Sequence, residues 1–253
     1  MKLKYTLPKG LLYYPYMLEM IEENHTVIAG TTGSGKSVLE NNIIYSLLCT
    51  HYPGKVENGK GCKFVLIDPK KVELDIYKSL PHTLLYADNI NDIENALYYV
   101  RQLINKRLTE MKMNGWRKSK ELPIYIFIDE LVDIILSNRS KQIIDLIKDS
   151  ISISRACNIF FVMLTQAPNR KILKPEIMLN CNCRVALYCN DSIESRQIIN
   201  DNTACQLPFH GLGIVQQNID RYMIKIPMIT DKQIKEIVFH WNKQHSFIRK
   251  MFR

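Results

Sequence analysis

Short apolar runs alternate along this chain with segments whose apolar residues recur every three or four positions. The short runs, rich in Val, Ile and Phe, predict strands at Val27–Ala29, Lys63–Ile67, Ile124–Ile128, Ile159–Leu164 and Arg184–Tyr188. The helical spacing predicts helices at Ser37–Cys49, Ile93–Met113, Ile143–Ser154, Ser192–Asn200 and Thr230–Lys243. Gly213–Gln217 and Met223–Ile226 have the pattern of a closing hairpin. Alternation of strands and helices predicts an α/β fold, a mainly parallel sheet with helices on both faces.

Length and composition fit one globular domain. The chain has 253 residues, of which 46% are hydrophobic, enough for one substantial core. We expect a single domain over residues 1–253, with residues 1–23 as a short lead-in. Because no stretch approaches the ~18 uninterrupted apolar residues of a membrane span, we expect a cytoplasmic protein without a membrane anchor.

Charge and cysteine content suggest a partner and a compartment. The formal net charge of +9 favours a polyanionic partner, with nucleic acid as the first candidate, although much of the excess is also explained by a solvated C-terminal face. Seven scattered cysteines fit a reducing compartment. Cys181, Cys183 and Cys189 resemble the start of a zinc site, but no Cys-x-x-Cys pair or nearby His completes it, so buried free thiols are favoured.

The first predicted strand runs into a Gly-x-x-x-x-Gly-Lys-Ser segment that opens the first helix. Its residues are Gly30, Thr31, Thr32, Gly33, Ser34, Gly35, Lys36 and Ser37. Such a loop turns consecutive backbone N–H groups toward phosphates, at the positive end of the helix dipole. Lys36 would reach the β- and γ-phosphates, and the Ser37 hydroxyl would bind Mg²⁺. A glycine-rich turn before an ordinary helix is the alternative, but the strand and helix are both present as the motif requires.

Two carboxylates, Asp129 and Glu130, end the apolar strand Ile124–Ile128. At the ligand-binding edge of an open α/β sheet, Asp129 would hold Mg²⁺ through water, and Glu130 would polarise the water that attacks the γ-phosphate. Acidic residues also favour the first turn of a helix, here Leu131–Leu136, and the two interpretations are compatible. The segment Asn105-Lys106-Arg107-Leu108 lacks the Asp of a guanine-binding motif, which favours ATP.

In their order, these motifs resemble the motor domain of the FtsK/SpoIIIE family of DNA translocases. The resemblance covers roughly residues 24–226. It rests on His25–Ser37, Asp68–Leu74, Ile128–Asp133, the segments Ser154–Ala156 and Leu164–Pro168, and Asp191–Ser192 with Ser195–Arg196. It implies a RecA-like P-loop core that hydrolyses ATP and moves double-stranded DNA as a ring of identical subunits, with a hexamer expected.

The resemblance also implies roles for individual residues. Gln166 would sense the γ-phosphate from the tip of a strand beside the acidic strand. Arg184 would reach into the ATP site of a neighbouring subunit, a role for which Arg155 and Arg196 compete. Arg139, Lys141, Arg170 and Lys171 lie in segments that resemble pore loops and would grip DNA phosphates without reading bases. A structural or solvated role is the alternative at each position.

The sequence also departs from the family pattern. Ala167 stands where the family usually has Arg, and the glycine-rich turn near Asn202–Leu207 is reduced. The winged-helix module and most of the subdomain that precedes the motor core are not found, which would fit a phage, plasmid or integrative element. A conjugative coupling or DNA-packaging ATPase, localised by a membrane, relaxosome or capsid partner, is therefore the first alternative function. A regulatory protein that binds ATP without hydrolysis is the second, and the presence of Glu130 argues against it.

Overall fold

The computed structural model describes residue 8 and residues 14–56, 59–207 and 211–251. These residues form an eight-stranded sheet in the order β3-β2-β4-β5-β1-β6-β7-β8. Pairing is parallel from β3 to β6 and antiparallel from β6 through β8. The strands are β1 Thr26–Ala29, β2 Lys63–Ile67, β3 Thr83–Ala87, β4 Ile124–Ile128, β5 Ile159–Thr165, β6 Cys183–Leu187, β7 Leu212–Gln217 and β8 Asp220–Lys225.

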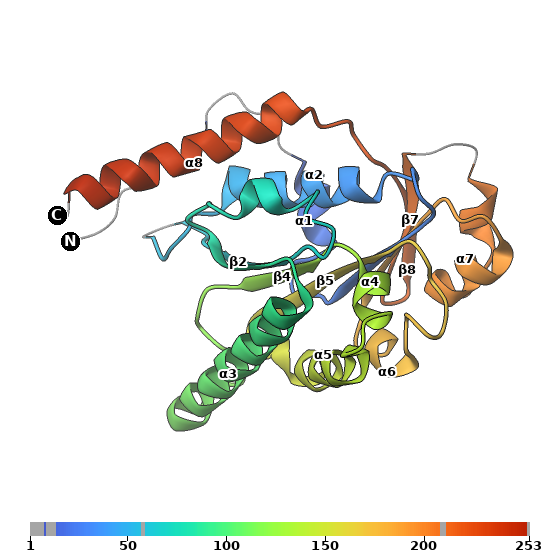
Figure 1. Cartoon of the computed structure of the whole chain (residues 1–253), viewed down its shortest axis with the longest axis horizontal. Coiled ribbons are helices and arrows are strands. Elements are labelled where there is room, and N and C mark those ends of the chain that lie inside the picture. The colour runs from blue at the N-terminus through green and yellow to red at the C-terminus, as the bar shows by residue number, and fades with distance from the viewer. Residues whose placement is uncertain (1–7, 9–13, 57–58, 208–210, 252–253) are drawn as a thin grey trace.

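Helices cover both faces of the sheet, as the alternating pattern predicts (Figure 1). One face carries α1 Pro15–Glu19, α2 Lys36–Thr50, the 3₁₀ turn η1 Asp75–Tyr77 and α8 Asp231–Met251. The other face carries α3 Ile90–Asn114, α4 Leu131–Ile135, α5 Ser140–Ser154, α6 Pro175–Met178, α7 Ser192–Ile199 and η2 Thr203–Gln206. None of the described helices is long and apolar enough to cross a membrane.

The central strands are apolar on both sides because each face packs against a helical layer. Every residue of β4 and β5 is buried. Along β5, Phe160, Val162 and Leu164 contribute to the core under α2, while the alternate residues contribute to the core under α3 and α5. A strand buried on both faces has no polar alternation, which explains the continuous apolar runs in the sequence.

The parallel register brings the carboxyl ends of six strands to one edge of the sheet. Ala29 of β1 is level with Thr165 of β5 and Ala186 of β6. Ile128 of β4 is level with Ile67 of β2 and Met163 of β5. The segments that follow these strands therefore meet, and this edge is where an open α/β sheet binds its ligands.

Most predicted elements are present, and the differences have local causes. Strand β3 is missing from the prediction because it lies at the sheet edge and is largely half-buried, which weakens its apolar signal. The second hairpin strand begins at Asp220 rather than Met223, because Asn218 takes a left-handed conformation and the turn is tight. Helix α8 continues beyond Lys243 to Met251, and Ile248 in this extension is still buried.

The lead-in is part of the core where the structure describes it. Met17, Met20 and Ile21 are fully buried beneath α2, and Thr26 of β1 donates a hydrogen bond of 2.6 Å to the Met20 carbonyl. Residues 1–7 and 9–13 of the predicted lead-in lie outside the described residues.

Candidate nucleotide site

The glycine-rich segment forms a loop between β1 and α2. Gly35 has a φ of +103°, a conformation that side chains other than that of Gly rarely adopt. At Gly30 a Cβ would come within 2.8 Å of the Leu187 Cβ and the Ser34 Oγ, so a larger residue would displace the loop. The Thr31 N–H donates to the Tyr188 carbonyl at 2.9 Å, which ties the loop to the end of β6. These contacts fix the loop at the N-terminus of α2. The dipole of this 15-residue helix favours an anion there.

The Lys36 side chain folds back over this loop. Its Nζ donates to the carbonyls of Gly30 at 2.8 Å and Thr31 at 2.9 Å. Burial lowers the pKa of Lys36 from its ordinary value, while the negative charge of Glu130 opposes the shift. A poorly solvated ammonium beside the N-terminus of a helix favours the binding of an anion.

Asp129 and Glu130 face the loop from the end of β4. Both residues are almost fully buried. Burial raises the pKa of Asp129 to about 6, and the nearby carboxylates of Asp68 and Glu73 add to the shift. The carboxyl end of β4 therefore has an excess of negative charge that a cation would offset.

The Glu130 carboxylate is held in one orientation by two backbone groups. Its Oε1 accepts hydrogen bonds of 3.2 Å from the N–H groups of Val132 and Gln166. Glu130 is the N-cap of α4, so the helix-start interpretation of this acidic pair is correct for Glu130. The same geometry holds its carboxylate against the end of β5, so the capping role does not remove it from the site.

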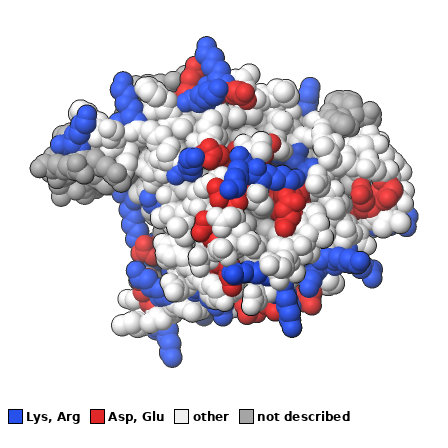
Figure 2. Space-filling model, in the orientation of Figure 1, with Lys and Arg blue, Asp and Glu red and all other residues white. Residues whose placement is uncertain are grey.

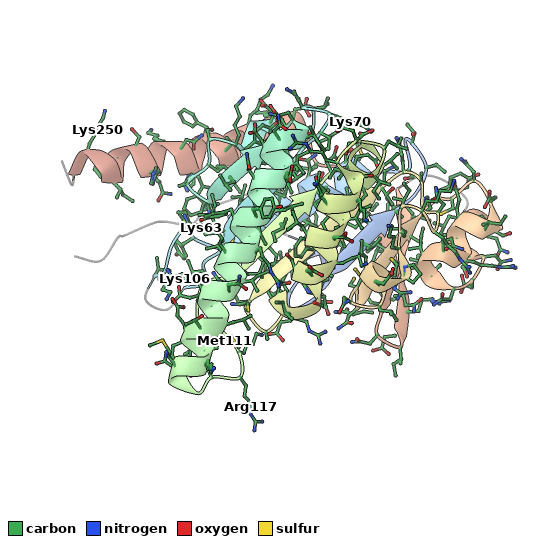
Figure 3. All side chains as sticks on the ribbon, turned by 60° about the horizontal axis from the view of Figure 1, so that its bottom comes forward. Lys63, Lys70, Lys106, Met111, Arg117 and Lys250 are labelled. Atoms are coloured by element: carbon green, nitrogen blue, oxygen red, sulfur yellow. The ribbon has the colours of Figure 1, made fainter. Side chains whose placement is uncertain are left out.

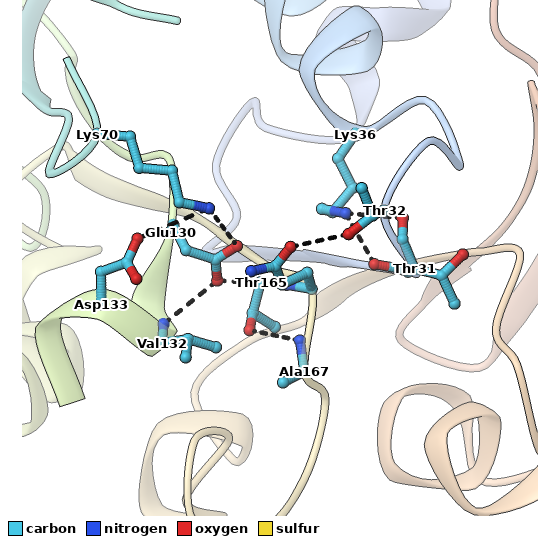
Figure 4. A network of polar contacts seen from close by, with 11 residues as sticks. Thr31, Thr32, Lys36, Lys70, Glu130, Val132, Asp133, Thr165 and Ala167 are labelled. Carbon is cyan, nitrogen blue, oxygen red and sulfur yellow. Dashed lines mark hydrogen bonds and ion pairs between the residues drawn. The ribbon is translucent and has the colours of Figure 1, made fainter. Parts of the chain in front are cut away.

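Gln166 links two edges of the site, which are marked by Thr32 and Glu130 in Figure 4. It follows β5, which lies beside the acidic strand β4, as the family resemblance implies, and has β1 on its other side. The Thr32 Oγ1 donates a hydrogen bond of 3.0 Å to the Gln166 Oε1, and the Gln166 N–H reaches Glu130. A single residue thus connects the phosphate loop to the acidic strand end.

Lys70 completes this group, and sequence reasoning assigned it no role. It follows β2, the neighbour of β4, and its Nζ lies 3.6 Å from the Glu130 Oε2 and 3.7 Å from the Asp133 Oδ2. The Asp68-Pro69-Lys70 motif could have indicated this role, because a charged residue that follows a parallel strand lies at the ligand-binding edge of the sheet.

Glu40 is a second residue that sequence reasoning missed. It lies on α2 one turn after Lys36 and is fully buried, and its carboxyl group faces that of Asp129. Burial raises its pKa well above the ordinary value, and the carboxylate of Asp129 adds to this shift. Its position in a mostly apolar helix gave no sign of this contact.

These residues surround one cavity of about 340 Å³. It is lined by Thr32, Gly33, Gly35, Lys36, Ser37, Val38, Lys70, Val72, Glu73, Asp129, Glu130 and Gln166. Larger hollows of about 590 and 750 Å³ contain none of these groups. The largest is lined in part by Arg117, which lies at the opposite end of the molecule from Lys70 in Figure 3. The chemistry of the lining therefore selects the smaller cavity as the candidate site.

The three candidate arginines lie outside this cavity lining. Arg184 of β6 is held within its own chain, since its guanidinium donates to the carbonyls of Met178 at 2.8 Å and Cys181 at 3.3 Å. Arg155 and Arg196 are exposed. The structure of one subunit therefore leaves their roles between subunits as predictions.

The predicted DNA-contacting side chains are on the surface. Lys141, Arg170 and Lys171 are exposed, whereas Arg139 forms an ion pair of 2.5 Å with Glu94 of α3. The thiols of Cys181, Cys183 and Cys189 are buried.

Comparison with known proteins identifies relatives of this arrangement. The model of the FtsK/SpoIIIE family matches residues 1–202. The DNA translocase FtsK of Leptospira interrogans is 32% identical over 85% of this chain and 24% of its own length. The chain therefore spans about a quarter of that relative.

Two solved structures have the same fold. The conjugation coupling protein TcpA of pCW3, solved in a monomer form with ATPγS, has a TM-score of 0.73 at 22% identity, over 86% of this chain and 64% of TcpA. ATPases 2 and 3 of EssC from Geobacillus thermodenitrificans have a TM-score of 0.74 at 16% identity, over 90% of this chain and 45% of EssC. The two structures confirm the α/β fold, and the family model and the FtsK relative confirm the resemblance that the motifs indicate.

Proposed function

The chain belongs to the FtsK/SpoIIIE family and has a P-loop ATPase fold, and from this premise we propose that it is an ATP-hydrolysing motor for double-stranded DNA. We further propose that residues 1–253 act as one motor domain and that the active form is a ring, with six subunits expected. The FtsK relatives are DNA translocases, and DNA translocation is our proposal for this chain.

The observation that carries the proposal is the composition of the 340 Å³ cavity. A phosphate loop with its lysine lines one side, and Glu130 with Gln166 lines the other. Glu130 is fixed by two backbone N–H groups and would polarise the attacking water. Gln166 would report the state of the γ-phosphate, because it touches both the phosphate loop and Glu130.

The residues present fit a magnesium ion. Glu40 is fully buried with its carboxyl group facing Asp129, and the Oδ1 of the buried Asp68 accepts no hydrogen bond from the part of the chain that the structure describes. Together with Asp129 they place three carboxyl groups side by side, and a cation between them would favour their ionised forms. Ser37 and Asp129 would hold the ion. Bound Mg²⁺ would neutralise charge on the phosphates, while Lys36 binds and orients them.

The arginine and DNA contacts belong to the assembled ring. We propose that Arg184 completes the ATP site of the adjacent subunit, with Arg155 and Arg196 as the competing candidates. Because the family's trans-acting arginine makes turnover depend on a neighbour, ATPase activity would rise with protein concentration. Arg139, Lys141, Arg170 and Lys171 would contact DNA phosphates, so DNA binding would weaken with salt.

The distribution of charged side chains suits DNA binding that does not depend on the base sequence. Acidic and basic side chains are interspersed over the face in Figure 2, so the net charge of +9 is not concentrated in one patch there. Such a surface supports contacts made by exposed loops rather than by a basic groove on this face.

The test is steady-state ATP hydrolysis by the 253-residue chain, with and without linear duplex DNA, over a range of protein concentrations. We expect stimulation that requires both DNA and high protein concentration, and no turnover by Lys36→Ala. A rate indifferent to both variables would contradict the translocase proposal. Turnover that appears only with an added membrane or capsid partner would instead support a coupling or packaging ATPase.

A further inference from the structure

Lys70 occupies a position in the nucleotide site that the proposed roles of Lys36, Glu130 and Gln166 leave unexplained. We propose that Lys70 holds Glu130 while the site lacks ATP and that its ammonium binds the γ-phosphate when ATP enters, so that Lys70 distinguishes ATP from ADP. This inference rests on the proposed ATPase function and concerns the same site.

The ion pair that Lys70 makes is loose and shared. Its Nζ lies 3.6 Å from the Glu130 Oε2 and 3.7 Å from the Asp133 Oδ2, both longer than the 2.7–3.2 Å of an ordinary hydrogen bond. The Lys70 side chain is 41% exposed, whereas that of Glu130 is 3% exposed. The lysine is therefore the movable partner, and the carboxylate is the fixed one.

The Glu130 carboxylate is fully engaged in this arrangement. Its Oε1 accepts from Val132 and Gln166, and its Oε2 faces the Lys70 ammonium. A carboxylate that polarises water needs an oxygen that can accept from that water. Removal of the ammonium from Oε2 would expose this oxygen to the cavity while the two backbone hydrogen bonds keep the carboxylate in place.

The cavity gives Lys70 a route to a bound nucleotide. Lys70 and Lys36 both line it, and Figure 4 shows the two side chains approaching from different sides of the site. The γ-phosphate of ATP carries more charge than either carboxylate and presents three acceptor oxygens, so it would compete for the ammonium. ADP lacks this group, and Lys70 would then remain with Glu130.

Lys71 is a matched control on the neighbouring position. It is 58% exposed and pairs with Asp88 at 3.4 Å, and it is not among the residues that line the cavity. The chain therefore offers two adjacent lysines, each in an ion pair, of which only one faces the site.

The test measures dissociation constants for ATPγS and for ADP, each with Mg²⁺, by isothermal titration calorimetry. The proteins are the wild-type chain, Lys70→Ala, Lys70→Arg and Lys71→Ala. A hydrogen bond to a charged group changes affinity by about tenfold or more, so we expect Lys70→Ala to weaken ATPγS binding by about that factor. ADP binding should change less than about twofold, Lys70→Arg should restore most of the preference, and Lys71→Ala should match wild type.

Two results would overturn this inference and leave the ATPase proposal in place. One is equal weakening of ATPγS and ADP by Lys70→Ala, which would mean that Lys70 only supports the structure. The other is no change in the dissociation constant of either nucleotide in Lys70→Ala, measured alongside a wild-type chain that hydrolyses ATP with DNA. A wild-type chain that binds neither nucleotide would overturn both proposals. Circular dichroism of each variant would confirm that it is folded.

Discussion

Glu130 has a structural role as the N-cap of α4 and a proposed chemical role in polarising water, and two substitutions separate these roles. Its carboxylate caps α4 and contacts the Gln166 N–H through Oε1, and it is also the proposed group that polarises water. Glu130→Gln keeps an oxygen at the Oε1 position but removes the negative charge. Glu130→Ala removes both. The comparison therefore tests the structural and chemical assignments in one experiment.

The magnitudes follow from the contacts. Loss of a general base lowers turnover by about 10²–10⁴-fold, and we expect both variants to show it. Loss of an N-cap costs about 0.5–2 kcal/mol, and an unsatisfied buried N–H at Gln166 costs about 1–3 kcal/mol. Glu130→Ala should therefore lose about 1.5–5 kcal/mol of stability, which for a chain of this size lowers Tm by roughly 3–20 °C. Glu130→Gln should remain close to the wild-type Tm.

A coupled-enzyme ATPase assay with saturating duplex DNA measures turnover, thermal denaturation measures Tm, and calorimetry with ATPγS checks that nucleotide still binds. Turnover of Glu130→Gln at the wild-type rate would refute the assigned chemistry. An equal fall of Tm in both variants would refute the hydrogen bonds assigned to Oε1, since Gln preserves that acceptor.

Two further predictions concern Asp129 and Arg184. Burial raises the pKa of Asp129 from an ordinary 3.8 to about 6 in the native state. Between these two pH values the native state therefore binds more protons than the unfolded state. The nucleotide-free chain should lose about 2–3 kcal/mol of stability from this group as the pH rises from about 4 to 6. Urea denaturation across this range should show the loss in wild type and a flatter profile in Asp129→Asn, and parallel profiles would contradict the assignment. Arg184→Ala should lower DNA-stimulated turnover by about 10³-fold with ATPγS affinity retained; if the fall instead occurs in Arg155→Ala or Arg196→Ala, the trans-acting role belongs to that residue.

Features encoded in contiguous residues could be predicted from the sequence. The phosphate loop was found because Gly30 to Ser37 follow one another between a strand and a helix, and the glycine conformations it needs are local. Asp129 and Glu130 were found because an apolar strand ends directly before them. The α/β class followed from alternating periodicities, since each strand and each helix carries its own pattern of buried positions.

Contacts between distant segments could not be predicted in this way. Thr32 and Gln166 are 134 positions apart, and they meet because β5 lies beside β1 in the sheet. Lys70 reaches Glu130 because β2 is the neighbour of β4, and Glu40 faces Asp129 because α2 crosses the sheet above it. Helix and strand periodicity reports which face of an element is buried, but not which element covers it. The amino-acid sequence by itself determined the kind of site and its local residues, whereas the strand order of the folded sheet decided which charges oppose one another across it.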